Sequence, residues 1–291
     1  MKIALVTYND NGVYHLASLK NEDDLLVEYL ERKGLTIEKP VWNNPRVEWE
    51  SYDIVLLKSP WDYFNLIDDF YTWLTKMEDK NIKFLNPIAT VKWNADKHYL
   101  KNIEDSGLKI APCIFLEKGE QVNLNDFFPS LNTTKLIVKP VVSGGSKNTF
   151  KVVAANVEEI NHQLQSLVEV EDFIVQPFLN EIEENGEWSF LFFGGKFSHA
   201  LVKKAKAGDF RVQHVFGGTI HPQQPPKDLI EIAQGYVDHF AKGCLYARVD
   251  GVLVGEQFLL MELELIEPYL FLETNQDSLE NYYQALLRLM K

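Results

Sequence analysis

The chain has 291 residues, about twice the length of a typical domain, so two or three lobes with a sizeable buried core are expected. Hydrophobic residues make up 46% and charged residues 24%, which is ordinary globular usage, and no uncharged apolar run is long enough to span a bilayer. The net charge of -13 disfavours DNA or RNA as a partner. A small polyanion such as a nucleotide stays compatible, because acids that hold divalent cations can receive phosphate.

The amino terminus gives no sign of export. Residues 1–12 contain one lysine, a short apolar run and then polar residues, and they lack the apolar core of a signal peptide. A cytoplasmic location is therefore expected. Cys113 and Cys244 lie far apart and form neither a CxxC pair nor a disulfide framework, so both are expected to be small core residues.

Short apolar runs alternate with amphipathic stretches over the first ninety or so residues, which predicts a small parallel α/β lobe over residues 1–93. Strands are expected at residues 3–7, 53–57 and 82–85, and helices at 24–32 and 66–76. Ligands of such lobes bind beyond the carboxyl ends of the strands. A substrate is therefore expected near the loops that follow Thr7 and Lys58.

A second lobe is predicted over residues 94–177. It begins with a single helix over 94–107, with Asn94 as its N-cap and Gly107 as its end. Strands are expected at 136–139, 150–153 and 173–176, and a helix at 157–168.

The third lobe, residues 178–291, contains two predicted antiparallel pairs. They join residues 188–193 with 196–203, and residues 246–254 with 258–265. A helix that starts after two prolines is expected between the pairs, and another at 277–290. The fold class is therefore α/β for the first lobe and α+β for the other two.

The last predicted strand pair carries the most informative charges. A three-residue loop at 255–257 would place Asp250 opposite Glu262 and Arg248 opposite Glu264, on the face away from the apolar side chains. Directly opposed carboxylates destabilise a sheet unless a cation compensates them, and Mg²⁺ binds a few carboxylates together with substrate phosphates. The hypothesis is a magnesium and phosphate site. The alternative is a solvated face that carries charges by chance.

Four other features carry weaker signals. Lys139 ends a strand, and the glycines of the following VVSGGSKNT would let backbone amides approach phosphate, although a plain turn is the commoner interpretation. Residues 174–179 either offer backbone groups to an adenine edge or simply connect two lobes. Lys203 and Arg211 either bind an anionic group or carry ordinary surface charge. Lys97 is expected to be a solvated helix residue.

The loop Trp61-Asp62-Tyr63 places two large aromatic side chains at a strand end. It is either a staple between lobes or one wall of a substrate pocket. Zinc and serine hydrolases find no support, because the sequence has no metal-spaced Cys/His cluster and no GxSxG motif.

Taken in order, these features resemble the ATP-grasp superfamily over nearly the whole chain. The resemblance implies an N-terminal parallel α/β lobe and two α+β lobes that clamp ATP between them. Arg248, Asp250, Glu262 and Glu264 look like the closing signature of D-alanine:D-alanine ligases, in which the arginine stabilises the tetrahedral oxyanion and the later residues hold two Mg²⁺ ions. That signature usually has Asn where Glu264 stands, so one or two ions are expected, with Mn²⁺ able to substitute.

The resemblance also implies roles for residues elsewhere in the chain. It implies two lysines that bind the phosphates of ATP and a glycine-rich loop that covers these phosphates. It also implies a hinge segment that binds adenine and an acidic residue near the ribose. These implied nucleotide-binding residues are Lys97, Lys139, Ser143, Gly144, Gly145, Gln176, Pro177, Phe178, Leu179 and Glu187. Lys203 and Arg211 would assist Arg248, and Trp61, Asp62 and Tyr63 would contact the substrate.

Several segments resemble a subgroup, that of D-cycloserine synthetases and related ATP-grasp proteins. They are SPWDY, WNADKHYL, GEWSFLFFGGKFSHAL, GDFRVQHVFGGT and MELELIEPYLFL. The subgroup is a weaker guide to the substrate than to the ATP chemistry, because pocket loops diverge.

The implied activity is that of an ATP-dependent ligase. It would convert a small amino-acid-like carboxylate into an acyl phosphate and form a C–N bond between or within molecules, releasing ADP and phosphate. A nucleotide-binding regulator and a small-molecule kinase on the same scaffold are the alternatives. The expected partners are a small substrate and, by family analogy, a second copy in a homodimer, with no nucleic acid and no membrane.

Overall fold

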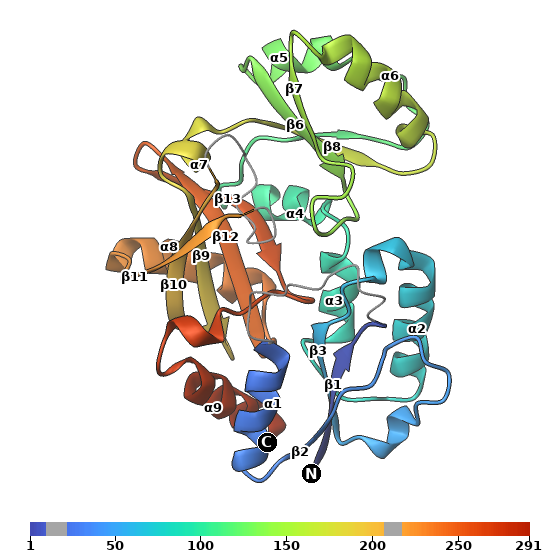
Figure 1. Cartoon of the computed structure of the whole chain (residues 1–291), viewed down its shortest axis with the longest axis vertical. Coiled ribbons are helices and arrows are strands. Elements are labelled where there is room, and N and C mark those ends of the chain that lie inside the picture. The colour runs from blue at the N-terminus through green and yellow to red at the C-terminus, as the bar shows by residue number, and fades with distance from the viewer. Residues whose placement is uncertain (10–21, 207–216) are drawn as a thin grey trace.

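The computed structural model describes residues 1–9, 22–206 and 217–291, and within these ranges the chain forms three sheets (Figure 1). One four-stranded sheet lies at the top of this view. The five-stranded sheet and the parallel four-stranded sheet lie below it, on the left and on the right. In the same part of the chain, no helix combines the length and the apolar character that crossing a bilayer requires.

The N-terminal lobe is built on a parallel sheet with the strand order β2-β1-β3-β4, as the sequence predicts. Its elements are β1 (Lys2–Thr7), α1 (Glu22–Arg32), β2 (Thr36–Glu38), β3 (Ile54–Ser59), α2 (Ile67–Asp79) and β4 (Phe84–Leu85), with 3-10 turns at Trp49–Ser51 and Tyr63–Asn65. The side chains of β1 pack alternately toward α1 and toward α2, which explains why both faces of the strand are apolar. The short β2 was not predicted, because three residues are too few to show alternation.

The segment after this lobe forms two short helices, so the single helix predicted over 94–107 is wrong. The helices are α3 (Ile88–Asn94) and α4 (Tyr99–Asp105). Asn94 ends α3 instead of capping a helix start. Its buried amide donates to the carbonyl of Leu263 at 2.7 Å and accepts from the amide of Leu265 at 2.9 Å. The side chain thus bonds the backbone of the last strand, which sequence alone could not reveal.

The lobe at the top of Figure 1 has a sheet of order β5-β8-β6-β7, covered on one face by helices. Its elements are β5 (Ile114–Leu116), α5 (Phe127–Ser130), β6 (Lys135–Pro140), β7 (Phe150–Val153), α6 (Val157–Val168) and β8 (Phe173–Pro177), with a 3-10 turn at Leu124–Asp126. Val138 and Val175 pack toward α6. Side chains at alternate positions, such as Lys139 and Ile174, therefore point away from α6.

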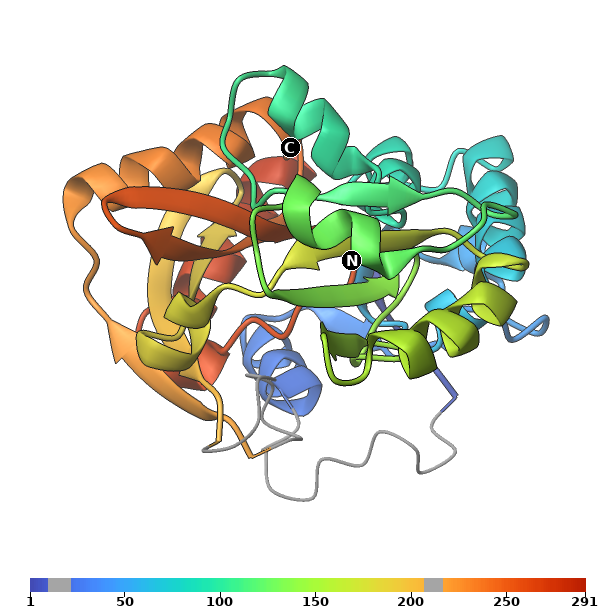
Figure 2. The same ribbon diagram turned by 90° about the horizontal axis from the view of Figure 1, so that it is seen from above.

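The five-stranded sheet has the order β11-β10-β9-β12-β13 and pairs antiparallel throughout. The last part of the chain consists of α7 (Asn180–Glu184), β9 (Glu187–Phe193), β10 (Lys196–Lys204), β11 (Thr219–Gln223), α8 (Lys227–Phe240), β12 (Tyr246–Val254), β13 (Gln257–Glu264), a 3-10 turn at Leu272–Thr274 and α9 (Ser278–Met290). The predicted strand pairs are confirmed, whereas the short helix α7 was not predicted. Seen from above, the β5–β8 lobe lies in front, between the five-stranded sheet and the helices of the N-terminal lobe (Figure 2).

The loop between β12 and β13 has two residues, not the predicted three. Val254 pairs with Gln257, and Gly251 pairs with Leu260. A β-bulge then adds one residue to β13, so that Asp250 faces Glu262 as predicted. A Cβ atom at Gly251 would lie 2.5 Å from the carbonyl oxygen of Leu259, so the bulge leaves room only for glycine.

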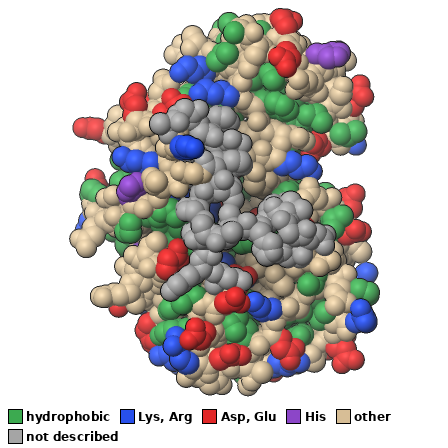
Figure 3. Space-filling view, viewed as in Figure 1, with side chains coloured by type: hydrophobic (Ala, Val, Ile, Leu, Met, Phe, Trp, Pro, Cys, Tyr) green, Lys and Arg blue, Asp and Glu red, His purple; other side chains and the backbone are tan. Residues whose placement is uncertain are grey.

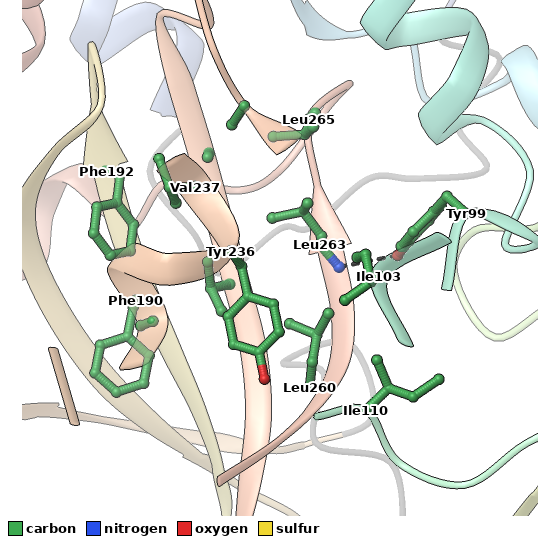
Figure 4. Close-up of a cluster of buried hydrophobic side chains, with 14 of the residues drawn as sticks. Tyr99, Ile103, Ile110, Phe190, Phe192, Tyr236, Val237, Leu260, Leu263 and Leu265 are labelled. Atoms are coloured by element: carbon green, nitrogen blue, oxygen red, sulfur yellow. Dashed lines mark hydrogen bonds between the residues drawn. The ribbon is translucent and has the colours of Figure 1, made fainter. Parts of the chain in front are cut away.

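Two buried clusters hold the lobes together. One joins α4, α8 and the five-stranded sheet, and in it the amide of Leu263 donates to the hydroxyl of Tyr99 at 2.9 Å (Figure 4). The other joins Ile3 and Leu5 of β1 to Leu286 of α9 and Leu191 of β9. Because these cores are continuous across the sheets, the edges that carry polar side chains are fixed relative to one another.

Candidate active site

β12 and β13 carry one cation and three carboxylates on one face. Arg248 pairs with Glu264 and Asp250 with Glu262, and β9 adds Ser189 opposite Asp250. Apolar side chains of the same strands fill the core on the other face. The predicted convergence of the charges on one face is therefore confirmed, and they are buried or half-buried instead of lying on a solvated surface.

Asp250 is the most enclosed of the acids, with 1% of its surface exposed. Its carboxylate accepts hydrogen bonds from Arg248 Nη2 at 2.8 Å, Lys203 Nζ at 3.0 Å and the hydroxyl of Ser189 at 2.6 Å. Burial opposes ionisation, but the two cations outweigh it and lower the pKa of Asp250. The carboxylate is thus held charged.

Glu262 connects the five-stranded sheet to the β5–β8 lobe. Its Oε1 atom lies 2.7 Å from Lys139 Nζ on β6 and 3.9 Å from Lys97 Nζ. Burial would raise the pKa of Glu262, yet Lys139 and Lys97 lower it to about 2. This carboxylate is therefore ionised over the whole physiological range.

Glu264 and Glu267 behave differently from Glu262. Glu264 is hydrogen-bonded to Arg248, but burial and the charges of Asp250 and Glu262 raise its pKa to about 7. Glu267, just after β13, has no ion pair with a described residue, and burial together with the charge of Glu264 raises its pKa to about 8. Among the described acids of the site, Glu264 and Glu267 are therefore the ones that keep a proton near neutral pH.

Lys97 is buried, which contradicts its default interpretation as a solvated helix residue. Its Nζ atom donates to the carbonyl oxygen of Ser143 at 3.2 Å and lies 3.3 Å from the Ser143 hydroxyl. Burial lowers the pKa of Lys97, while Glu262 opposes that shift. The lysine thus joins the glycine-rich loop to the acids.

The glycine-rich loop rests against the N-terminal lobe. A Cβ atom at Gly144 would lie 2.5 Å from the ring of Phe64, and Gly145 has a positive φ of 60°. Lys147 Nζ donates to the side-chain oxygen of Asn65 at 2.8 Å. Contact with the 3-10 turn of the first lobe, together with the left-handed backbone, explains why glycines stand at 144 and 145.

The predicted adenine hinge begins with an unpartnered amide. Gln176 is 1% exposed, and neither its side-chain nitrogen nor its oxygen has a hydrogen-bond partner in the described part of the chain. Pro177 ends β8, the amide of Phe178 donates to Lys135 O at 2.8 Å, and Leu179 immediately precedes α7. A buried amide without partners costs free energy unless a ligand supplies them.

Glu187 pairs with a predicted catalytic cation. Lys203 Nζ lies 3.3 Å from its carboxylate, which makes Lys203 a link between Glu187 and Asp250. Burial raises the pKa of Glu187 despite this lysine. Arg211, the other predicted helper of Arg248, lies outside the described residues.

The aromatic loop contributes one partly exposed side chain near the acids. Trp61 Nε1 donates to the backbone carbonyl of Glu267 at 3.3 Å. Asp62 instead accepts from the indole of Trp42 at 2.7 Å, and Tyr63 is buried in the core of the first lobe. Trp61 therefore faces the site, while the side chains of Asp62 and Tyr63 are engaged within their own lobe.

A second charge cluster, which the sequence analysis missed, lies where β3 ends. Lys58 is 1% exposed, and its Nζ atom lies 2.9 Å from Glu22 and 3.3 Å from Asp23 at the start of α1. The Glu22 carboxylate also accepts from the backbone amides of Leu270 and Leu272. The signal was Lys58 itself, because a lysine within a buried strand requires acids nearby.

Figure 3 draws the charged side chains on one face of the molecule. On the face drawn in Figure 3, acidic and basic side chains are interspersed over the described part of the chain. No basic stripe of the kind that a nucleic-acid polymer requires is seen among the described residues of this one face.

A family comparison decides the class of protein. Residues 116–277 match the family described as "Prokaryotic glutathione synthetase, ATP-grasp domain", and residues 3–86 match "D-cycloserine synthetase DcsG, N-terminal domain". The chain belongs to the ATP-grasp family. It is thus of the carboxylate–amine ligase type, and the ATP-grasp fold expected from the sequence is confirmed.

Individual relatives agree with this assignment. The cycloserine biosynthesis protein DcsG of Streptomyces lavendulae is 24% identical over 91% of this chain and 93% of its own. The crystal structure of D-cycloserine synthetase DcsG matches with a TM-score of 0.83, 24% identity and full coverage of both chains. D-alanine–D-alanine ligase of Bacillus anthracis, complexed with ATP, matches with a TM-score of 0.68 and 16% identity over 100% of this chain and 97% of the other.

The candidate active site also contains two residues that were not predicted from the sequence. Ser189 and Glu267 touch or approach the acids, although neither was in the predicted set. Glu267 stands in the segment MELELIEP, three residues after Glu264 at the end of β13, and this closeness in sequence was the available signal. Ser189 gave none, because serine in an apolar strand is common.

Proposed function

We propose that this chain is an ATP-dependent ligase that activates a small amino-acid-like carboxylate as an acyl phosphate and joins it to an amine, releasing ADP and phosphate. The observation that carries the proposal is the buried cluster in which Asp250, Glu262 and Glu264 pair with cations from separate elements of the fold. Such a cluster contains both the carboxylates that a divalent metal needs and the cations that a triphosphate needs.

The donor set of the acids fits Mg²⁺. Asp250, Glu262 and Glu264 offer carboxylate oxygens on one face, and Mg²⁺ prefers a few such oxygens together with phosphate oxygens. We propose that these three residues hold one or two Mg²⁺ ions, with Mn²⁺ able to replace them. The bound metal would supply neutralisation of phosphate charge.

The unpartnered amide of Gln176 supports a nucleotide in this site. One side-chain amide offers a donor and an acceptor, which is the pairing that adenine presents with its amino group and ring nitrogen. Gln176, Pro177, Phe178 and Leu179 would hold the base, and Glu187 is proposed near the ribose. Neither polar atom of Gln176 is satisfied by a described residue, so a ligand there restores two hydrogen bonds.

The residues of the chain divide the remaining tasks. Lys97 and Lys139 would bind the phosphates, and the loop of Ser143, Gly144 and Gly145 would exclude water. A carboxylate oxygen of the substrate attacks the γ-phosphorus while the bond to ADP breaks. The amine then attacks the acyl carbon and phosphate leaves. Arg248 would stabilise the negative oxygen of that second step, helped by Arg211, and Lys203 would hold Asp250 in place.

The substrate side of the site is proposed at the first lobe, where Trp61 reaches Glu267 and where Asp62 and Tyr63 shape the loop. The relative named for cycloserine biosynthesis covers nearly the whole chain, and this supports ring closure within one substrate molecule as one form of the reaction. We also propose a cytoplasmic location, where ATP is supplied, and assembly as a homodimer.

A substrate screen tests the proposed function. The full chain is incubated with ATP, Mg²⁺ and a panel of amino acids, hydroxamates and ureido compounds, and ADP, phosphate and product mass are measured. We expect ADP and phosphate in equal amounts when the correct carboxylate is present, and a hydroxamate product when hydroxylamine is added. Release of AMP and pyrophosphate would refute the proposal.

Two variants separate the ligase from its alternatives. Asp250→Asn should abolish turnover, whereas Asp228→Asn on the exposed surface of α8 should leave it unchanged. A phosphorylated product that accumulates without C–N bond formation would indicate a kinase. Tight ATP binding without turnover on any substrate, unaffected by Asp250→Asn, would indicate a regulator.

A further inference from the structure

Three metal-ligating side chains converge outside the active site. His98 lies just before α4, Glu117 follows β5 and Asp172 precedes β8, and their ligand atoms all lie within 4.8 Å of one another. We propose that these three side chains bind a divalent transition-metal cation of the zinc class. The site is distinct from the acids of β12 and β13, and the inference does not depend on the proposed ligase activity.

The imidazole of His98 is already oriented as a ligand. Its Nδ1 atom lies 2.7 Å from the carboxylate of Asp96. This contact favours the tautomer with hydrogen on Nδ1, which leaves the Nε2 lone pair available. The ring also stacks on Phe115 with centroids 4.3 Å apart, so its plane is fixed. A carboxylate that holds the remote nitrogen of a histidine is the usual support of a metal-bound imidazole.

The Nε2 atom of His98 needs a partner. It is buried and makes no hydrogen bond to a described residue, although the side chain as a whole is partly exposed. Glu117 Oε1 lies 3.5 Å away, close enough for an electrostatic contact but without the alignment of a hydrogen bond. A cation between these atoms would satisfy the lone pair and the carboxylate together.

One of the two carboxylates is held in place by the backbone, whereas Glu117 is exposed on the surface. Asp172 Oδ1 accepts from the backbone amide of Lys118 at 2.5 Å. Among the described residues, the lysine that pairs with these carboxylates is Lys101, whose Nζ atom lies 3.7 Å from Glu117 Oε1. Together with Asp96, the cluster contains three carboxylates, and one lysine is paired with them. A divalent cation would compensate the excess.

The mixture of ligands sets the chemical class of the ion. One imidazole nitrogen and two carboxylates suit Zn²⁺, Co²⁺ or Ni²⁺, whereas Mg²⁺ and Ca²⁺ prefer oxygen ligands alone. Zinc binds these atoms at about 2.0–2.2 Å, so the three side chains need small rotations to close around it. Three protein ligands would leave a coordination position for water.

Because of where the cluster lies, a bound ion would affect the stability of the fold. His98 directly follows the buried Lys97, whereas Glu117 and Asp172 belong to the β5–β8 lobe. A metal there would tie the segment that carries Lys97 to two strands of that lobe. We therefore expect binding to stabilise the chain against unfolding, because the ligands lie far apart in sequence.

Metal titration of the full chain tests the proposal. Zn²⁺ or Co²⁺ is titrated calorimetrically in excess Mg²⁺, which is added to fill the magnesium site proposed at Asp250, Glu262 and Glu264, and Co²⁺ coordination is followed by visible absorption. We expect one equivalent to bind the wild-type chain and to raise its unfolding temperature. His98→Gln should weaken binding by at least about 100-fold, and Asp96→Asn, which removes only the support of the imidazole, by about 10–100-fold.

Matched variants make the result decisive. His162→Gln removes an exposed histidine of α6 and should leave the metal affinity unchanged. Asp172→Asn should weaken binding as His98→Gln does, and it provides a second test should His98→Gln fail to fold. The proposal is overturned by a wild-type chain that takes up no Zn²⁺ in excess Mg²⁺. It is equally overturned by a folded His98→Gln or Asp172→Asn variant that retains wild-type affinity, because the cluster is then an ordinary ion-pair network.

Discussion

Lys203 illustrates how a single buried cation supports two acids. It contacts Asp250 at 3.0 Å and Glu187 at 3.3 Å and is itself 7% exposed. Lys203→Met leaves Glu187 without that cation, whereas Asp250 keeps Arg248. Removing one partner of a buried pair costs about 3–5 kcal/mol, so we expect a loss near the lower end of that range in urea unfolding.

The control for this variant lies on the surface. Lys227 of α8 pairs with Glu231 one turn away, and its side chain is 90% exposed. Lys227→Met should change the free energy of unfolding by less than about 0.5 kcal/mol. Equal losses for Lys203→Met and Lys227→Met would show that the buried network contributes nothing to stability.

Glu267 should make the metal-free protein less stable as the pH rises. Burial and the charge of Glu264 raise its pKa in the folded state to about 8, above the ordinary value of 4.5. Between these values the folded chain keeps a proton that the unfolded chain releases, so the free energy of unfolding falls with increasing pH. Glu267→Gln should reduce this fall between about pH 5 and pH 8, measured by urea unfolding in EDTA. The same slope in wild type and variant would contradict the raised pKa.

The sequence predicted the charged face but not the environment of each residue. Alternation along β12 and β13 was enough to place Arg248, Asp250, Glu262 and Glu264 together, because side-chain direction in a strand is local. The burial of Lys97, and of the Gln176 amide that no described residue satisfies, depends on which lobes pack over them. Such contacts arise from tertiary structure, so local patterns indicated only weak candidates there.

At the scale of elements, the bulge in β13 decides whether the acids face each other. A Cβ atom at Gly251 would meet the Leu259 carbonyl at 2.5 Å and the ring of Phe258 at 2.3 Å. Gly251→Ala must therefore move backbone, and we expect a loss of about 1–3 kcal/mol in thermal or urea unfolding together with weakened Mg²⁺ binding. Gly235→Ala, in α8 where the nearest atom is at an ordinary 3.6 Å, should leave Mg²⁺ binding unchanged and stabilise slightly. Normal stability and metal binding in Gly251→Ala would mean that the register tolerates a shifted bulge.

Helices and strands were predicted well where the hydrophobic pattern repeats several times. They were predicted poorly where a side chain hydrogen-bonds to the backbone of another element. Helix α6 and strand β12 have the predicted bounds, since each shows several repeats of its period. The prediction of one helix over 94–107 was wrong because the side chain of Asn94 hydrogen-bonds to the backbone of β13, 169 residues away in sequence. The two-residue loop after β12 was also missed, because a bulge restores the same pairing and leaves no trace in the spacing of charges.

At the scale of the whole molecule, the order of the sheets along the chain could be predicted, but the cores that connect them could not. The chain order of parallel and antiparallel segments indicated the three sheets. β1 packs against α9, so elements from opposite ends of the sequence share one core. Neither element has a sequence pattern that identifies the other as its packing partner. Ion pairs between lobes are hidden from the sequence for the same reason.

The pair of Lys139 and Glu262 connects two lobes across 123 residues and predicts cooperative binding of metal and nucleotide. Nucleotide alone would draw Lys139 and Lys97 to its phosphates and leave Glu262 without them. Metal alone would occupy the acids and leave the two lysines without Glu262. Bound together, the two ligands satisfy both sets of side chains, so each should strengthen the binding of the other, by a coupling of about 1–3 kcal/mol or about 5–150-fold.

Calorimetric titration of ATP with Mg²⁺ and with EDTA measures this factor. Glu262→Gln should strengthen binding of metal-free ATP, because it frees both lysines, and should reduce the effect of Mg²⁺. An ATP affinity that is the same with and without Mg²⁺ in the wild-type chain would show that the acids and the lysines serve separate ligands.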